Sequence, residues 1–140
     1  MPNRKLEAVI ATVPVFASLS KRHLKKIAGL MSTDRYHEGA TVIREGDPGD
    51  SFYVMVAGRA KVVADGKTIH RLIPGDHFGE ISLLDGGERS ATVATETPVE
   101  LLRLQRSSFM KLVRDDADLA RALLASLARM VRRVDRSLDR

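Results

Sequence analysis

The sequence predicts an α+β fold of one domain, 1–140, in which an antiparallel β-roll of the double-stranded β-helix or jelly-roll type is flanked by helices. Two observations lead to this prediction. A central zone, 34–105, is rich in β-branched residues and is divided by regularly spaced turn signals. The zones on either side, 1–33 and 106–140, carry apolar residues at helical spacing. A chain of 140 residues can bury a core without disulfides.

The N-terminal zone is expected to hold two helices. Apolar residues recur at helical spacing until Pro14, which ends the first helix. Ser20 is a candidate N-cap of the second helix. The residues expected to face inward are Leu6, Val9, Ile10 and Val13 in the first helix and Leu24, Ile27, Ala28 and Met31 in the second.

The central zone is expected to hold six short strands separated by turns rich in Gly, Pro and Asp. The pair Asp65-Gly66 suits a two-residue hairpin turn of type I′. The expected strands are 41–43, 52–56, 60–63, 67–73, 92–94 and 99–104.

The C-terminal zone is expected to hold a short helix capped by Ser107 or Ser108, then a long one capped by Asp115 or Asp116. The apolar seam of the long helix can pack on the roll, or it can form a homodimer interface, and the two interpretations have equal standing. Both can hold, because the helix carries two apolar strips. The first strip is Ala120, Leu123, Leu127, Met130 and Val134, and the second is Leu124, Val131 and Leu138.

The composition excludes several classes of protein. The chain has no Cys, which rules out disulfides and thiolate zinc sites. No apolar run approaches the ~18 residues needed to span a bilayer, and the N-terminus lacks a signal-peptide pattern, so we expect a cytoplasmic protein without a membrane partner. The net charge of +5 would suit nucleic acid, but the basic residues concentrate only in 21–26 and 129–140 and aromatic residues are few.

One run, 78–93, interrupts the strand pattern. The stretch 80–84 is long enough for one helical turn, which Gly86 and Gly87 would end. A short helix entered through Gly79 would present free backbone N–H groups, which can bind a phosphate. Because Gly79 has no Cβ, a ligand can approach the backbone closely.

The side chains of this run add groups that suit a ribose with a singly charged phosphate. The guanidinium of Arg89 can hold two oxygens of one phosphate. The Ser90 hydroxyl and the Ala91 N–H can add further bonds, and the Glu80 carboxylate can accept from a sugar hydroxyl. A cyclic 3′,5′-phosphodiester has this shape and charge, whereas a triphosphate would need a Lys and a GxxxxGK[ST] pattern that the loop lacks.

The run resembles the phosphate-binding cassette of cyclic nucleotide-binding domains, as found in catabolite activator proteins, protein kinase A regulatory subunits and nucleotide-gated channels. FGEISLL at 78–84 and RSATV at 89–93 fit that pattern with no missing position, and the resemblance extends over about 15–135. It implies that Arg89 pairs with the cyclic phosphate and that Glu80 bonds the ribose 2′-OH. It also implies a final helix that closes over the base as a lid. The further ligand contacts it implies are Gly79, Ile81, Ser82, Ser90 and Ala91.

An enzyme is not expected. Jelly-roll folds also host metal enzymes with clustered His ligands, but no two of the four His lie close in sequence. His77 with Asp76 and Glu80 does not make a convincing metal set. No Ser lies in a G-x-S-x-G motif. We therefore expect neither a metal nor catalysis.

The expected function is a regulatory module that binds a cyclic nucleotide and couples binding to movement of the C-terminal helix. Cyclic AMP is favoured over cyclic GMP, although Ser90 supplies a hydroxyl that can help bind guanine. The alternative is a nucleotide-independent roll for dimerisation or interaction, or a fragment of a larger regulator. Because nothing follows Arg140, no DNA-reading helix-turn-helix is expected there, and the signal would pass to a separate protein effector.

Overall fold

The computed structural model describes residues 3–138. Contacts divide the described chain into two compact units. One unit is Leu30–Phe109, which contains all the strands. The other joins the described residues up to Gly29 to those from Met110 onward, and it is helical.

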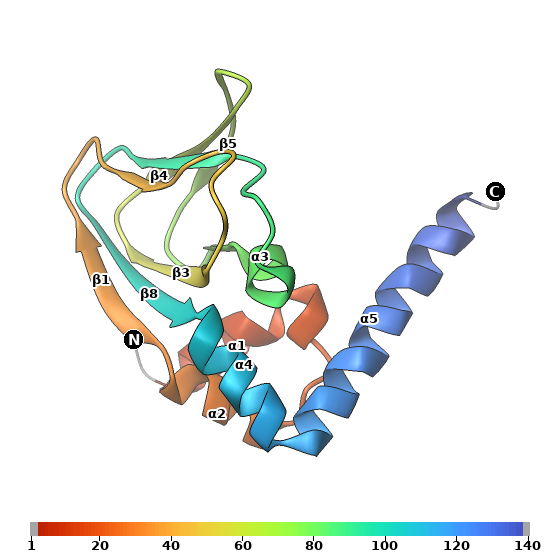
Figure 1. Cartoon of the computed structure of the whole chain (residues 1–140). Helices are drawn as coiled ribbons and strands as arrows, with labels where there is room; N and C mark the ends of the chain where they lie inside the picture. Colours follow the sequence, from red (N-terminus) through yellow and green to blue (C-terminus); the bar gives the residue numbers. More distant parts are fainter. Residues whose placement is uncertain (1–2, 139–140) are drawn as a thin grey trace. The chain divides into compact units, whose positions relative to one another are not determined.

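The unit Leu30–Phe109 is an antiparallel β-roll, which confirms the predicted fold class (Figure 1). It consists of two four-stranded sheets, with strand orders β1-β8-β3-β6 and β2-β7-β4-β5. A short helix, α3 (Glu80–Asp85), follows β6 and contacts β3. The strands are β1 (Ser32–Tyr36), β2 (Thr41–Ile43), β3 (Ser51–Ala57), β4 (Ala60–Ala64), β5 (Lys67–Leu72), β6 (His77–Phe78), β7 (Thr92–Thr95) and β8 (Val99–Gln105).

The core of the roll lies between the two sheets, because every second side chain of a strand faces inward. The rings of Tyr53 and Phe78 stack there with centroids 4.9 Å apart. The buried members of this cluster are Tyr53, Met55, Ala60, Leu72, Val93, Val99 and Leu101.

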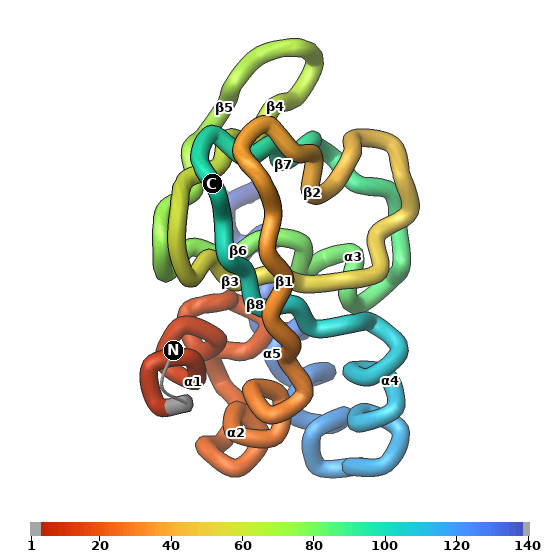
Figure 2. Tube along the Cα trace, turned by 90° about the vertical axis from the view of Figure 1, so that its left-hand side faces the viewer, coloured from red at the N-terminus to blue at the C-terminus, as the bar shows by residue number. Residues whose placement is uncertain are grey.

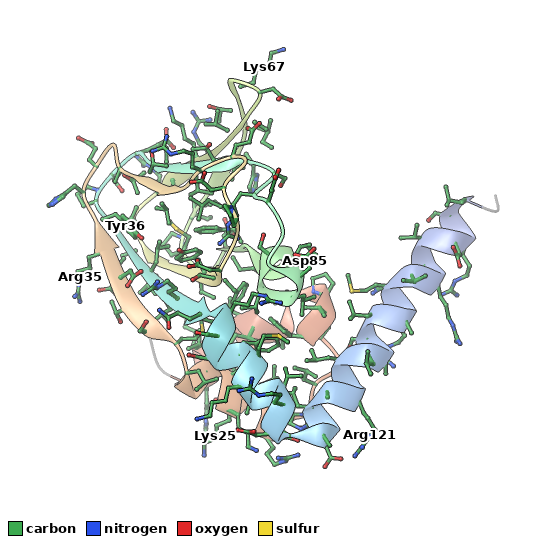
Figure 3. All side chains as sticks on the ribbon, viewed as in Figure 1. Lys25, Arg35, Tyr36, Lys67, Asp85 and Arg121 are labelled. Atoms are coloured by element: carbon green, nitrogen blue, oxygen red, sulfur yellow. The ribbon has the colours of Figure 1, made fainter. Side chains whose placement is uncertain are left out.

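The hairpin between β4 and β5 has the predicted two-residue turn. Ala64 pairs with Lys67, and both Asp65 (φ 52°) and Gly66 (φ 76°) have positive φ, as a type I′ turn requires. Figure 3 shows Lys67 at the tip of this hairpin.

Two strands were not predicted. β1 pairs with β8 over its full length, although the prediction had assigned residues up to 33 to the helical zone. Its sequence is polar because it is an edge strand, and its charges pair across the ladder: Asp34 contacts Arg103 at 3.0 Å and Arg35 contacts Glu100 at 2.8 Å. β6 has only two residues, too few to give a pattern. Figure 2 shows β1 running along the roll beside β8.

The N-terminal segment of the helical unit contains α1 (Asn3–Ala11), a 3-10 helix η1 (Pro14–Phe16) and α2 (Lys21–Gly29). The Ser20 hydroxyl accepts from the His23 N–H at 3.2 Å, which confirms Ser20 as the cap of α2. α1 ends at Ala11, two residues before the predicted end next to Pro14, and Pro14 starts η1, which was not predicted. Leu6, Ile10, Val13, Leu24, Ile27 and Ala28 are buried as predicted, whereas Val9 and Met31 are half-buried.

The C-terminal segment contains α4 (Arg106–Asp115) and α5 (Ala117–Leu138). The capping prediction for Ser107 or Ser108 was wrong, because α4 already begins at Arg106. Asp116 is the cap of α5, as predicted: its Oδ1 accepts from the Leu119 N–H at 3.1 Å.

The burial of α5 changes along its length. The residues buried in α5 are Leu119, Leu123 and Ser126, so only Leu123 of the predicted first strip is buried, and Val134 is 59% exposed. The second strip, Leu124, Val131 and Leu138, is exposed. Within residues 3–138, no helix combines the length and apolarity needed to cross a bilayer.

Candidate functional site

A cavity of about 460 Å³ opens in the roll beside α3. Residues of β2, β4 and β7 line it together with α3, and Figure 3 shows Asp85 at the end of that helix. All seven residues singled out in the sequence lie on its wall: Gly79, Glu80, Ile81, Ser82, Arg89, Ser90 and Ala91.

Arg89 is the cation of this cavity, and it is 6% exposed. Its Nη2 donates to the Ser51 carbonyl at 2.8 Å. Its Nη1 is buried and has no hydrogen-bond partner among the described residues. A buried cation with an unused donor is unfavourable unless an anion reaches it, so the cavity wall is built to receive negative charge.

Backbone bonds between two loops hold Arg89 in place. The Arg89 N–H donates to the Asp47 carbonyl at 2.8 Å, and the Arg89 carbonyl accepts from the Gly46 N–H at 2.9 Å. The Gly49 N–H donates to the Gly87 carbonyl at 2.9 Å. The Asp- and Gly-rich turn at 46–50 therefore fixes the chain that carries the guanidinium.

Gly49 is required by close packing at this junction. A Cβ there would lie 2.2 Å from Ser82 Cβ and 2.9 Å from Arg89 Nε. Both Gly49 and Ser51 contribute to the site, and neither was singled out in the sequence. The only sequence signal was the Gly-Asp-Pro-Gly-Asp turn, which indicates a turn but not its partner.

Gly79 is the N-cap of α3, and its φ of 91° is one that a residue with a Cβ rarely adopts. A Cβ at Gly79 would also lie 2.7 Å from Arg89 Nη1, so glycine lets the guanidinium lie against the start of the helix. The first N–H groups of a helix have no intrahelical partner, so they and the guanidinium offer donors to the same volume.

The C-terminal end of α3 is also fixed by hydrogen bonds. Its C-cap, Gly86, donates its N–H to the Ser82 carbonyl at 2.8 Å, as the predicted Gly-Gly stop implies. Arg106 Nη2 donates to the Leu84 carbonyl at 3.1 Å.

Glu80 lies in the first turn of α3, with its Oε2 3.8 Å from His77 Nδ1. This distance is that of an ion-pair contact and is too long for a hydrogen bond. The interaction with His77 holds the pKa of Glu80 below its usual value and outweighs burial, which would raise it. The carboxylate is therefore an ionised acceptor at neutral pH.

For two of the other predicted residues, Ser82 and Ile81, the side chain is not the group expected to contact a ligand. Ser82 Oγ donates to the Gly87 carbonyl at 3.2 Å, so its hydroxyl proton is engaged within the protein. The Ile81 side chain is 58% exposed. Ligand contacts from these two residues would therefore come from their backbone N–H groups.

Part of the cavity wall is apolar, and none of its residues was predicted as a ligand contact. It consists of Ile43, Val62, Phe78 and Val93. The lining of the cavity thus combines donors and a cation with apolar side chains, which suits a ligand with one anionic group and one flat apolar part. No group of three His, Asp or Glu within residues 3–138 is placed to hold a metal ion.

The sequence matches a protein-family model described as "Cyclic nucleotide-binding domain" over residues 33–116. Among curated proteins, the chain is similar to cAMP-dependent protein kinase regulatory subunits. The one from Colletotrichum orbiculare is 38% identical over 112 residues, covering 79% of this chain and 29% of the relative. The one from Schizosaccharomyces pombe is 38% identical over 116 residues, covering 82% and 28%. The chain thus spans under a third of the length of these relatives.

The chain is also similar to solved structures. The N-terminal domain of a transcriptional regulator from Streptomyces coelicolor A3(2) is 32% identical with a TM-score of 0.78, covering 93% of this chain and 94% of that one. The regulatory domain of Toxoplasma gondii PKA, crystallised with cAMP, is 30% identical with a TM-score of 0.69, covering 81% and 45%. The Thermus thermophilus catabolite activator protein is 34% identical with a TM-score of 0.66, covering 90% and 62%.

Proposed function

The chain belongs to the cyclic nucleotide-binding domain family, and we propose that it binds cyclic AMP in the cavity beside α3. The observation that carries this proposal is the buried, unpartnered Nη1 of Arg89, which lies next to the start of α3. A cyclic phosphodiester brings one negative charge, and this matches one guanidinium and a few N–H donors. Similarity to cAMP-dependent protein kinase regulatory subunits supports cyclic AMP over cyclic GMP.

Each part of the ligand has a proposed partner. Arg89 pairs with the phosphate, and the N–H groups of Gly79, Ile81, Ser82 and Ala91 and the Ser90 hydroxyl add hydrogen bonds. The Glu80 carboxylate accepts from the ribose 2′-OH, since it is ionised and lines the same cavity as Arg89. The purine lies against the apolar wall, 43, 62, 78 and 93.

Calorimetric titration with cyclic AMP, cyclic GMP and 5′-AMP tests the proposal. We expect saturable binding of cyclic AMP with the highest affinity, and a loss of about 100-fold or more in Arg89→Gln, because a buried charge-assisted pair is lost. Arg59→Gln is the matched control: Arg59 is exposed on the same roll, and its side chain has no ion pair among the described residues.

Equal affinity in the wild type and Arg89→Gln would overturn the site assignment. A wild type that binds none of the three nucleotides would favour the nucleotide-independent scaffold. Cyclic GMP binding tighter than cyclic AMP would favour the alternative ligand, with Ser90 as the group to test next.

We further propose that the chain is a regulatory module without catalytic activity of its own. The relatives named as regulatory subunits support an effector protein acting in trans, such as a protein kinase catalytic subunit. Coupling of ligand binding to the C-terminal helix, absence of direct DNA binding and a cytoplasmic location stay predictions, as does the single-domain organisation over 1–140.

A further inference from the structure

A second cavity, of about 420 Å³, lies within the helical unit and shares no residue with the nucleotide cavity. One side comes from α5 and the other from the segment 12–18, which contains η1. Its lining residues are Thr12, Pro14, Ala17, Ser18, Ser126, Arg129, Arg133 and Arg136.

The α5 side of this cavity is a row of cations. Arg129, Arg133 and Arg136 follow Ser126 at spacings of three, four and three residues, so all four lie on one face of the helix. Among the described residues, no carboxylate lies within 4.0 Å of any of the three guanidiniums. All three arginines are exposed, so they repel one another only weakly in water, and a multiply charged anion can pair with more than one of them at once.

Ser126 provides an independent observation at the same place. It is 2% exposed, and its Oγ is buried without a hydrogen-bond partner among the described residues. Buried hydroxyls in proteins normally have a partner, so an unpaired one on a cavity wall points to a ligand acceptor. The hydroxyl of Thr12 on the facing side already donates to the Val9 carbonyl at 2.6 Å.

We propose that this cavity, which we call the arginine cavity, binds a small multiply charged phosphate anion. Guanidinium groups pair with phosphate oxygens in a two-pronged geometry, and the Ser126 hydroxyl donates to a further oxygen. Arg129 and Arg136 are separated by about 10 Å along the helix, from a rise of 1.5 Å per residue. This length favours a condensed phosphate such as pyrophosphate over a single orthophosphate.

The test is calorimetric titration with sodium pyrophosphate, orthophosphate and sulfate at constant ionic strength. It is carried out on the full chain in the presence of saturating cyclic AMP and again in Arg89→Gln, so that the nucleotide cavity is filled or disabled. We expect saturable binding of one pyrophosphate in both conditions, with orthophosphate and sulfate weaker. Equal, non-saturating heats for all three anions would overturn the proposal, as would pyrophosphate binding that cyclic AMP or Arg89→Gln abolishes.

Charge-matched variants separate the cavity from the general charge of the helix. Arg129→Gln with Arg133→Gln should weaken pyrophosphate binding by about tenfold or more, because two charge-assisted pairs are lost. The control is Arg132→Gln together with Arg121→Gln, which removes two charges from the same helix outside the cavity lining. An equal loss in both pairs would show a non-specific charge effect and overturn the proposal.

Ser126→Ala tests the cavity without changing its charge. We expect pyrophosphate to bind several-fold more weakly, while the midpoint of thermal unfolding without ligand stays the same or rises, because an unpaired buried hydroxyl is removed. Unchanged pyrophosphate affinity in this variant would overturn the assignment of Ser126 as a ligand group.

Discussion

Arg89 determines much of the chemistry of the nucleotide cavity, and its burial has a consequence for the free protein. Only one end of its guanidinium is bonded within the protein, to the Ser51 carbonyl. The other end, Nη1, is buried without a partner among the described residues. The free protein therefore holds a desolvated charge with an unused donor, which an anionic ligand would satisfy.

This arrangement predicts that Arg89→Met keeps the fold but removes the response to ligand. Replacing a buried, incompletely paired cation with an apolar side chain of similar length is often neutral or stabilising. We expect the unfolding midpoint without ligand to stay within a few degrees of wild type, a range equivalent to about 1 kcal/mol. Cyclic AMP should no longer raise that midpoint. Thermal unfolding with and without ligand measures both, and a variant that still gains stability from cyclic AMP contradicts the assignment.

Glu80 is predicted to recognise the ribose 2′-OH. In the wild type, replacing cyclic AMP by 2′-deoxy cyclic AMP should weaken binding by about tenfold or more, since a hydrogen bond to a charged group is lost. In Glu80→Ala, which leaves no side-chain acceptor at this position, the two ligands should bind with nearly equal affinity. Competition titrations of both ligands against both proteins measure this coupling. A 2′-deoxy penalty of the same size in the variant would show that the hydroxyl meets another group.

Gly49 is predicted to be essential for the geometry around Arg89. An added Cβ at Gly49 would meet Ser82 Cβ at 2.2 Å, and Ser82 cannot move without displacing α3. Gly49→Ala should lose about 1–3 kcal/mol of unfolding free energy, as overpacked sites do, and should weaken cyclic AMP binding. Gly29→Ala is the control, because a Cβ at Gly29 would have no heavy atom within 4 Å. Chemical denaturation measures the unfolding free energy of both variants, and titration measures their affinity for cyclic AMP.

The residues of the candidate site were predictable to the extent that they lie in one contiguous run. The run 78–93 put Gly79, Glu80 and Arg89 within reach of each other, and the cavity contains them all. Gly49 and Ser51 could not be found in the same way. Their roles depend on a hydrogen-bonded junction between 46–50 and 87–89, which only the folded chain creates.

At the scale of elements, α5 begins at a concentrated electrostatic site within the helical unit. Asp116 caps the helix through the Leu119 N–H, and its Oδ2 lies 3.0 Å from Lys26 Nζ and 3.2 Å from Arg22 Nη1 of α2. Its side chain is 10% exposed. The hydrogen bond from Lys26, followed by that from the Leu119 N–H, holds the pKa of Asp116 far below its usual value.

This depressed pKa predicts a pH-dependent contribution to stability. A carboxylate whose pKa is lower in the folded state stabilises the fold above its unfolded pKa, and this stabilisation is lost as the pH falls below that value. Asp116→Asn should therefore lower the unfolding midpoint at neutral pH, and the difference from wild type should shrink below about pH 4, the usual pKa of Asp. Unfolding curves from pH 7 down to the acid range measure it.

Asp118→Asn is the control for this prediction. The Asp118 side chain is 66% exposed, and its ion pairs are with the exposed Arg22 and Arg121, so its removal should change little. A difference between Asp116→Asn and wild type that does not depend on pH would contradict the role of the ionised carboxylate.

Helices and strands were predictable where the sequence carries a periodic pattern of apolar residues or a clear local signal. The β-branched strands of the roll and the capped start of α2 gave local signals, and each lies where it was expected. β1 gave none, because an edge strand of polar sequence has no buried face to produce alternation. The apolar strips of α5 were recognised as such, but periodicity alone does not tell which part of a long helix is buried.

At the scale of the whole chain, α4 begins in the roll unit and continues into the helical unit, since the boundary between the units falls after Phe109. Its first residue, Arg106, donates its backbone N–H to the Asp50 carbonyl at 2.7 Å and its Nη2 to the Leu84 carbonyl of α3. A ligand that shifts α3 would therefore act directly on the residue where the chain leaves the roll. This contact offers a physical route for the proposed coupling between binding and the C-terminal helix.

Self-association through α5 remains a prediction, and the exposed second strip makes it testable. Leu124, Val131 and Leu138 recur every seven residues and are at least 60% exposed, a spacing typical of a coiled-coil seam. We expect the wild type to sediment as a dimer at micromolar concentrations, and Val131→Glu with Leu138→Glu to sediment as a monomer.

Ser137→Glu is the control for this last prediction, since it adds a negative charge to the same part of α5 at an exposed polar position. It should leave the dimer intact, because Ser137 lies outside the apolar strip. Analytical ultracentrifugation over a range of concentrations gives the mass of each form. The same mass for the wild type and the double variant at every concentration would contradict an interface on this strip. The exposed residues would then have to be explained by a different partner, since so much apolar surface along one helix face is unusual for a helix that stays solvated.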